Sequence, residues 1–246
     1  MMNTIINPAI FQHAATVVIS NWILWWGIWR FVPDTLNNYG FDFCGWKRYR
    51  RQNTLGGLLL LTFGNFIMGA ATKATSMPFS ALSAVGAILL FVSMWGVFRL
   101  DRAFQIIPDR FHLSGFLGAA IFTAGKITRN PADWTTIAVY CGLGLLLPVA
   151  LLGLNLTYRK IRGTEGLGTG DLKTLTWFAV AFQENVWLSF VAACLLAIVM
   201  QCLKLIVSRR MTLQSTFAFG PFLICGTLLV NILQLLNMFQ TGGMSH

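Results

Sequence analysis

Apolar residues run through the chain in long blocks that short polar and basic segments separate. A run of roughly 17–25 apolar residues suffices for a helix to cross a bilayer. The pattern predicts eight membrane helices, at 9–32, 55–72, 80–98, 112–125, 135–157, 172–182, 186–207 and 217–239. The fourth and the sixth are too short to cross without tilt or a neighbour's cover. We therefore expect an all-α, polytopic membrane bundle of about eight transmembrane helices.

Composition supports this class. Hydrophobic residues make up 56% of the 246 positions and charged residues only 11%, and the mean hydropathy is +0.65. A soluble domain of this size could not hide so much apolar surface in one core. No internal repeat or low-complexity linker divides the chain, so we expect a single integral-membrane domain over residues 1–246. No basic residue precedes the first apolar run, which argues against a cleaved signal peptide.

The basic residues predict the orientation, because cytoplasmic loops collect Lys and Arg. Of the eighteen Lys and Arg, only Lys73, Lys126 and Arg129 fall on one side of the predicted spans, and the other fifteen fall on the opposite side. This alternation predicts that both termini lie outside the cytoplasm. The net charge of +10 then belongs mostly to one face, where anionic lipid headgroups are the expected partner. Nucleic acid is a poor partner, because no soluble basic domain is present.

Metal binding is not expected. The five cysteines include no CxxC pair, and His13 and His112 have no Cys or Glu at ligand spacing. The longest polar segment, at 33–53, is a short cytoplasmic loop with the basic run KRYRR and a single cysteine, Cys44. We expect this run to anchor headgroups.

Three of the eight acids stand out by position. Asp101 follows the third span, where the carbonyl dipoles of a helix end disfavour a carboxylate. Asp109 follows Pro108 and is expected to cap the next helix. Asp171 follows Gly168 and Gly170 and opens the sixth span, where helix capping and a functional role remain equally open. Acids at the lipid boundary of two helices can converge, and two carboxyls sharing one proton are what an aspartyl protease needs.

Three segments resemble the type IV prepilin peptidases, a family of GxGD intramembrane aspartyl proteases. LDRAFQIIPDRFHL, at 100–113, resembles the family's Asp followed eight residues later by the Asp of a Pro-Asp pair. EGLGTGDLK, at 165–173, resembles its EGxGxGDxK loop, and FAFGPFL, at 217–223, resembles its PFGP segment. The related presenilins and signal peptide peptidases carry a Pro-Ala-Leu signature instead. The segment at 33–53 stands where many members carry a zinc-binding insert with paired CxxC motifs.

The resemblance implies a catalytic pair, Asp101 and Asp171. It implies that Gly168, Gly170, Lys173, Gly220 and Pro221 shape the loop or position the substrate, and that Asp109 and Glu165 are secondary acids. We expect Gly220 and Pro221 to break the last helix, and Lys173 to reach the headgroups or, as a minority view, the substrate. From the helix dipoles alone we expect Asp101 to be the protonated partner and Asp171 the ionised one.

The implied activity is cleavage of type IV prepilins or pseudopilins after a glycine, at the cytoplasmic face of the bacterial inner membrane. The cut separates a short basic leader, which Glu165, Asp109 and Asp42 could counter, from an apolar helix. Proteolysis needs no cofactor; S-adenosylmethionine is required only if the new N-terminus is also methylated, which remains open. The alternative is a small transporter or assembly subunit whose aspartates bind protons or cations, with Asn65, Asn155 and Asn231 as further polar residues.

Overall fold

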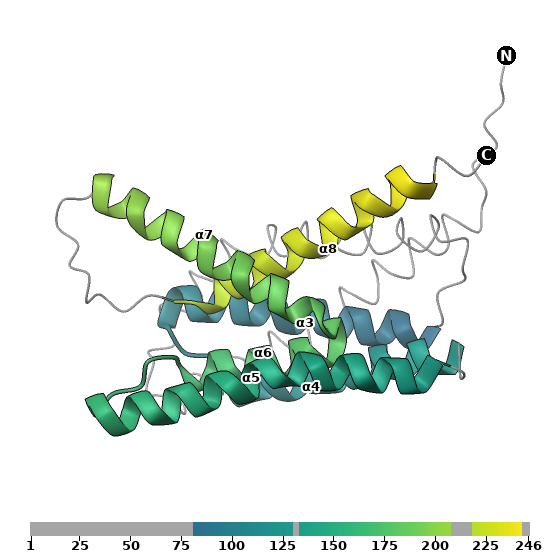
Figure 1. Cartoon of the computed structure of the whole chain (residues 1–246), viewed down its shortest axis with the longest axis horizontal. Helices are drawn as coiled ribbons and strands as arrows, with labels where there is room; N and C mark the ends of the chain where they lie inside the picture. The colour runs from purple at the N-terminus through teal and green to yellow at the C-terminus, as the bar shows by residue number, and fades with distance from the viewer. Residues whose placement is uncertain (1–80, 130–132, 208–217, 243–246) are drawn as a thin grey trace, which may run out of the picture. The chain divides into compact units, whose positions relative to one another are not determined.

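The computed structural model describes residues 81–129, 133–207 and 218–242 (Figure 1). Internal contacts divide the chain into two units, Met1–Thr75 and Ser76–His246, and every described residue lies in the second. The predicted spans at 9–32 and 55–72 and the basic loop at 33–53 lie outside the described residues. A single domain over residues 1–246 therefore stays a prediction.

All regular structure in the described part of the chain is helical, as predicted. The helices are α3 (Ala81–Phe104), α4 (Asp109–Arg129), α5 (Trp134–Arg162), α6 (Thr169–Phe182), α7 (Asn185–Val207) and α8 (Gly220–Gly242). Two stretches, Trp134–Arg162 and Asn185–Ile206, are long and apolar enough to cross a membrane. The structure thus supports a helical membrane protein, while the count of eight spans and the side of the termini stay predictions.

Several helix limits differ from the apolar runs. Helix α3 continues to Phe104, beyond the predicted end at 98, so Asp101 lies in its last turns and not after it. Helix α4 has 21 residues and is not the short element expected at 112–125. Polar and charged residues such as Asp109 and Arg129 extend these helices because helix propensity does not require apolar side chains. Helix α6 is short as predicted, with 14 residues, which is about 21 Å at 1.5 Å per residue.

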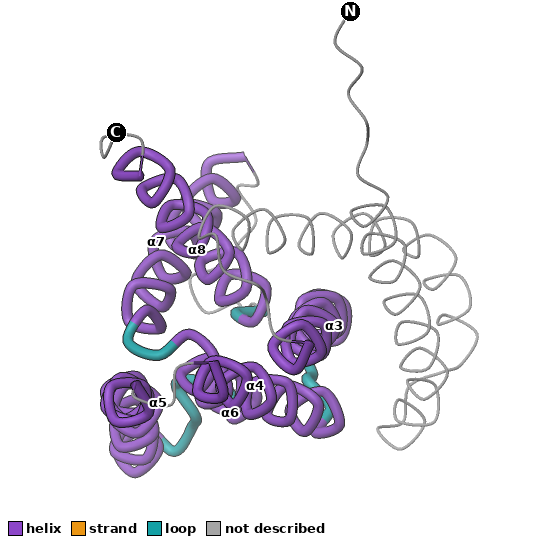
Figure 2. Tube along the Cα trace, turned by 90° about the vertical axis from the view of Figure 1, so that its right-hand side faces the viewer, coloured by secondary structure: helices purple, strands orange, loops and turns teal. Residues whose placement is uncertain are grey.

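The short helix α6 lies between α4 and α5 and packs on both (Figure 2). Helix α3 packs on α4 and on α8, and α8 packs on α7. Leu175, Trp177 and Phe178 of α6 are completely buried, so this helix forms the centre of the described bundle. Helices α5 and α7 instead expose many large apolar side chains, among them Leu146, Leu154, Leu188 and Ile198, as lipid-facing helices do.

The C-terminal end of α6 is held inside the bundle by donors from its neighbours. The carbonyl oxygen of Val180 accepts a hydrogen bond from Thr123 Oγ1 at 2.9 Å, and that of Ala181 accepts one from Lys126 Nζ at 3.3 Å. The last carbonyls of a helix have no partner within the helix, and leaving them unpaired in an apolar medium is costly. These bonds explain how α6 can stop short of crossing a bilayer.

Candidate active site

Asp101 is a buried acid that joins two helices distant in sequence. It lies in the last turns of α3 and its side chain is buried. Its Oδ2 accepts a hydrogen bond from the backbone N–H of Gly220, the first residue of α8, at 2.8 Å. The first N–H groups of a helix lack intrahelical partners and carry partial positive charge, so they are suitable donors to a carboxylate.

Gly220 and Pro221 therefore begin α8, and the expectation that they break the last helix is wrong. Proline is tolerated in a first helical turn because its missing N–H would have no partner there. Glycine at position 220 also allows a close approach: a Cβ atom there would lie 2.8 Å from Asp101 Oδ2 and 3.2 Å from a methyl carbon of Val97. Only a residue without a side chain lets Asp101 reach this N–H.

Asp171 lies in the first turn of α6, and it does not cap that helix. The N-cap is Gly168, with no side-chain hydrogen bond at the cap, so helix capping is excluded as the role of Asp171. Its Oδ1 is inaccessible to solvent and has no hydrogen-bond partner among the described residues. An unpaired buried carboxyl oxygen is costly and calls for a physical reason, of which a functional role is one.

The two carboxyls act on each other electrostatically. Both lie outside the two helices that are long and apolar enough to cross a membrane. Burial raises the pKa of Asp171, and the negative charge of Asp101 raises it further, to about 7. Burial also raises the pKa of Asp101, but the N–H of Gly220 opposes this rise by stabilising the charged form. The charge of the acid on α3 thus affects the pKa of the acid on α6.

The surroundings of the two acids oppose the order that the helix dipoles predicted. The Gly220 N–H stabilises the charged form of Asp101, whereas burial and the charge of Asp101 raise the pKa of Asp171 to about 7. The helix dipoles concern only the end of each acid's own helix. Asp101 also faces the N-terminus of a second helix, α8, and burial outweighs the dipole of α6 at Asp171.

The glycine loop before Asp171 is fixed by a residue that the sequence analysis did not assign to the site. Asn155 of α5 hydrogen-bonds to Gly166 and Leu167 through its side-chain amide. A lone polar residue inside an apolar run was the available signal, but its partners eleven and twelve positions later could not be read from spacing. Gly170 packs against the link that follows α3, because a Cβ atom there would lie 3.2 Å from Ile107 Cδ1.

Lys173 and Asp109 form an ion pair at 2.6 Å between α6 and α4. Both side chains are largely exposed, and the lysine lowers the pKa of Asp109. The two side chains therefore bind each other, and Asp109 lies in the first turn of α4. A contact of Lys173 with headgroups stays a prediction. Glu165 pairs with Arg159 at 3.4 Å, also on the surface, so neither secondary acid is free to receive a basic leader without giving up a partner.

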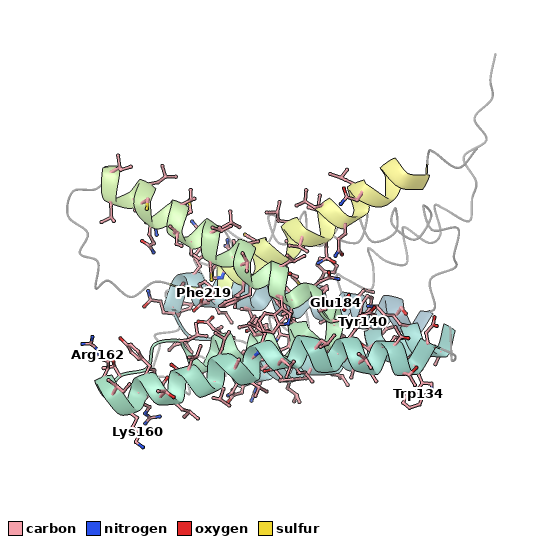
Figure 3. All side chains as sticks on the ribbon, in the orientation of Figure 1. Trp134, Tyr140, Lys160, Arg162, Glu184 and Phe219 are labelled. Carbon is pink, nitrogen blue, oxygen red and sulfur yellow. The ribbon has the colours of Figure 1, made fainter. Side chains whose placement is uncertain are left out.

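These groups lie toward one end of α5. Figure 3 shows Lys160 and Arg162 at one end of this helix and Trp134 at the other, with Phe219, directly before α8, nearer the Arg162 end. Within the described residues, no group of three His, Cys, Asp or Glu side chains is placed to hold a metal ion. The fold and the site define a helical membrane protein with one buried and one part-buried carboxyl, Asp101 and Asp171, near the basic end of α5.

Comparison with known proteins supports the resemblance that the motifs suggest. Residues 84–202 match the type IV leader peptidase family, and this segment, just under half of the chain, contains both Asp101 and Asp171. This match agrees with the resemblance that the motifs indicated. The chain is also similar to a prepilin leader peptidase/N-methyltransferase of Dickeya chrysanthemi, with 25% identity over 171 residues, which cover 67% of this chain and 54% of that protein. The match thus spans about half the length of this relative. No solved structure matches the chain.

Proposed function

We propose that this protein is a membrane-embedded aspartic endopeptidase that removes the short basic leader from type IV prepilins or pseudopilins, cleaving after a glycine. The observation that carries the proposal is the state of the two acids at the motif positions: Asp101 is buried and its Oδ2 accepts a hydrogen bond from the Gly220 N–H, and Asp171, on a separate helix, has a solvent-inaccessible Oδ1. The family of residues 84–202 supports the same activity. The similar protein of Dickeya chrysanthemi is named for prepilin leader cleavage and for N-methylation.

The proposed chemistry assigns different tasks to the two acids. Ionised Asp101, whose charge the Gly220 N–H stabilises, takes a proton from a water molecule as the water oxygen attacks the scissile carbonyl carbon. Protonated Asp171 donates a hydrogen bond to the carbonyl oxygen, on which negative charge develops. The peptide C–N bond then breaks, and the departing amine takes up a proton from the pair. A carboxyl whose pKa is near 7 can keep its proton for this task at neutral pH.

The proposed location is the bacterial inner membrane, with eight spans, both termini on the periplasmic side and the carboxyl pair near the cytoplasmic face. The distribution of Lys and Arg supports this orientation. A substrate whose leader stays in the cytoplasm and whose apolar helix stays in lipid must approach laterally between helices. Proteolysis by two carboxyls needs no cofactor, and S-adenosylmethionine enters only if the product is methylated. Anionic headgroups are the proposed lipid partners of the basic face.

The alternative of a proton or cation transporter is less well supported. Such a protein needs polar side chains in a path through the bundle. The amide of Asn155 binds the glycine loop through both its oxygen and its nitrogen, and Asn231 donates to the carbonyl oxygen of Thr227 in its own helix at 2.7 Å. Asn65 lies outside the described residues. The two described polar residues that suggested a path, Asn155 and Asn231, thus bind local backbone.

Co-expression with a candidate prepilin tests the proposal. A bacterial host without its own prepilin peptidase would carry the chain and the precursor, and N-terminal sequencing would locate the cut. We expect loss of the leader immediately after a glycine. An uncut precursor beside a membrane-inserted protein, across several pilin and pseudopilin substrates, would reject the proposal. A labelled methyl donor in the same cells tests the second activity.

A further inference from the structure

Asn155 makes three hydrogen bonds to the loop that precedes Asp171. It is buried and lies about two turns before the end of α5. Its Oδ1 accepts hydrogen bonds from the N–H groups of Gly166 at 2.9 Å and of Leu167 at 3.0 Å. Its Nδ2 donates to the carbonyl oxygen of Leu167 at 3.0 Å. One side chain thereby satisfies three backbone groups of a segment that has no regular structure.

The bonded residues connect directly to the helix that bears Asp171. Gly163 ends α5 in the left-handed region, at φ 73°, and turns the chain back. Leu167 is followed by Gly168, whose carbonyl oxygen accepts hydrogen bonds from the N–H groups of Asp171 at 3.1 Å and of Leu172 at 3.2 Å. The place of the first turn of α6, and hence of the Asp171 carboxyl, therefore depends on where Asn155 holds Leu167.

We propose that Asn155 is a positioning residue that fixes the glycine loop and so places the Asp171 carboxyl opposite Asp101. This inference rests on the proposed peptidase function. Asn155 does not touch the reacting groups; it acts through the backbone of Leu167 and Gly168.

The amide is chemically suited to this task because it both accepts and donates. Leucine has a similar shape but leaves the N–H groups of Gly166 and Leu167 and the carbonyl of Leu167 without these partners, which is costly in a buried position. Aspartate keeps an oxygen that accepts the two N–H groups, but an ionised carboxylate sets its second oxygen against the Leu167 carbonyl oxygen. Only the protonated acid can donate there. The Asn155→Asp variant should therefore hold the loop better, and cleave faster relative to wild type, as the pH falls.

The experiment compares full-length wild type with Asn155→Leu, Asn155→Asp and the control Asn231→Leu, all in detergent with a synthetic prepilin. Asn231 is a suitable control because its amide donates within its own helix. We expect Asn155→Leu to lower kcat by about tenfold or more, as a misplaced reacting group does, with a much smaller change in KM. Asn231→Leu should stay near wild type. The activity of Asn155→Asp relative to wild type should rise as the pH falls.

Hydrogen exchange at the N–H groups of Gly166 and Leu167 gives a readout independent of cleavage. We expect faster exchange in Asn155→Leu and unchanged exchange in Asn231→Leu. Wild-type kcat in Asn155→Leu overturns the inference, as does unchanged exchange at both N–H groups. If Asn155→Leu does not fold, the Asn155→Asp variant decides. A ratio of its cleavage activity to that of wild type that does not change with pH overturns the inference. Absence of cleavage by the wild type would reject the proposed function instead, and the exchange data would still show whether Asn155 holds the loop.

Discussion

The carboxylate of Asp101 accepts a hydrogen bond from the backbone N–H of Gly220 at 2.8 Å, across 119 positions of sequence. This contact joins the end of α3 to the beginning of α8 and gives one acid of the pair a stabilised negative charge. It links two of the three segments that suggested the family, since one contains Asp101 and another contains Gly220. The third segment contributes Asp171, whose pKa responds to the charge of Asp101.

Gly220→Ala should disturb this contact directly. The added methyl group would lie 2.8 Å from Asp101 Oδ2, so the carboxylate must move and its hydrogen bond lengthens or breaks. We expect prepilin cleavage to slow by about tenfold or more, with normal insertion. Gly142→Ala is the matched control, because a Cβ atom there meets nothing within 4 Å. Equal cleavage rates for the two variants, measured by quantifying precursor and product, would contradict the assigned role of Gly220.

Gly170→Val should impair cleavage more than membrane insertion. A Cβ atom at Gly170 would lie 3.2 Å from Ile107 Cδ1 and 3.3 Å from Ile107 Cβ, so the branched side chain forces α6 away from the link that follows α3. A pulse-chase assay would report cleavage and insertion in the same cells. The control is Gly153→Val, where the added Cβ meets nothing within 4 Å. A larger loss of insertion than of cleavage at Gly170 would show that its role is in folding.

Asp171 should make the protein less stable as the pH rises. Its pKa is raised from 3.8 to about 7 in the folded protein, so the unfolded chain loses this proton first. The stability from the bound proton is complete below about pH 4 and is lost as the pH rises to about 7. We expect Asp171→Asn to lack this contribution and to have a higher apparent Tm than wild type at pH 8. Thermal unfolding in detergent between pH 4 and pH 8 checks this; parallel curves for the two proteins would be inconsistent with a raised pKa.

The ion pair between Lys173 and Asp109 should contribute little to stability. Both side chains are largely exposed, and exposed pairs contribute about 1 kcal/mol or less. We expect Lys173→Met to lower the apparent Tm slightly at pH 7 and to return the pKa of Asp109 toward its ordinary value. Because that pKa is lowered by Lys173, the contribution is present above the unfolded pKa and disappears as the pH falls below it. Lys160→Met is a control on the exposed end of α5; an equal effect from both variants would exclude a specific pair.

Sequence patterns predicted the helical class and brought Asp101 and Asp171 forward as a pair, because long apolar runs and the GxGD motif are local features. They could not predict the protonation order, which depends on Gly220 of another helix and on burial. Helix limits at Asp109 and Phe104 were missed because hydropathy marks the apolar part of a helix and not its polar ends. Asn155 was missed because its hydrogen bonds form only after α5 and the loop fold together.

The most direct measurement is prepilin cleavage by the single variants Asp101→Asn and Asp171→Asn, each expressed in a host without other prepilin peptidases. Asparagine keeps the size of the side chain but can neither take the proton from water nor share one with the second acid. We expect each variant to insert normally and to leave the precursor uncut, while Asp109→Asn retains most of the activity. Cleavage at the wild-type rate by either of the first two variants would contradict the carboxyl pair.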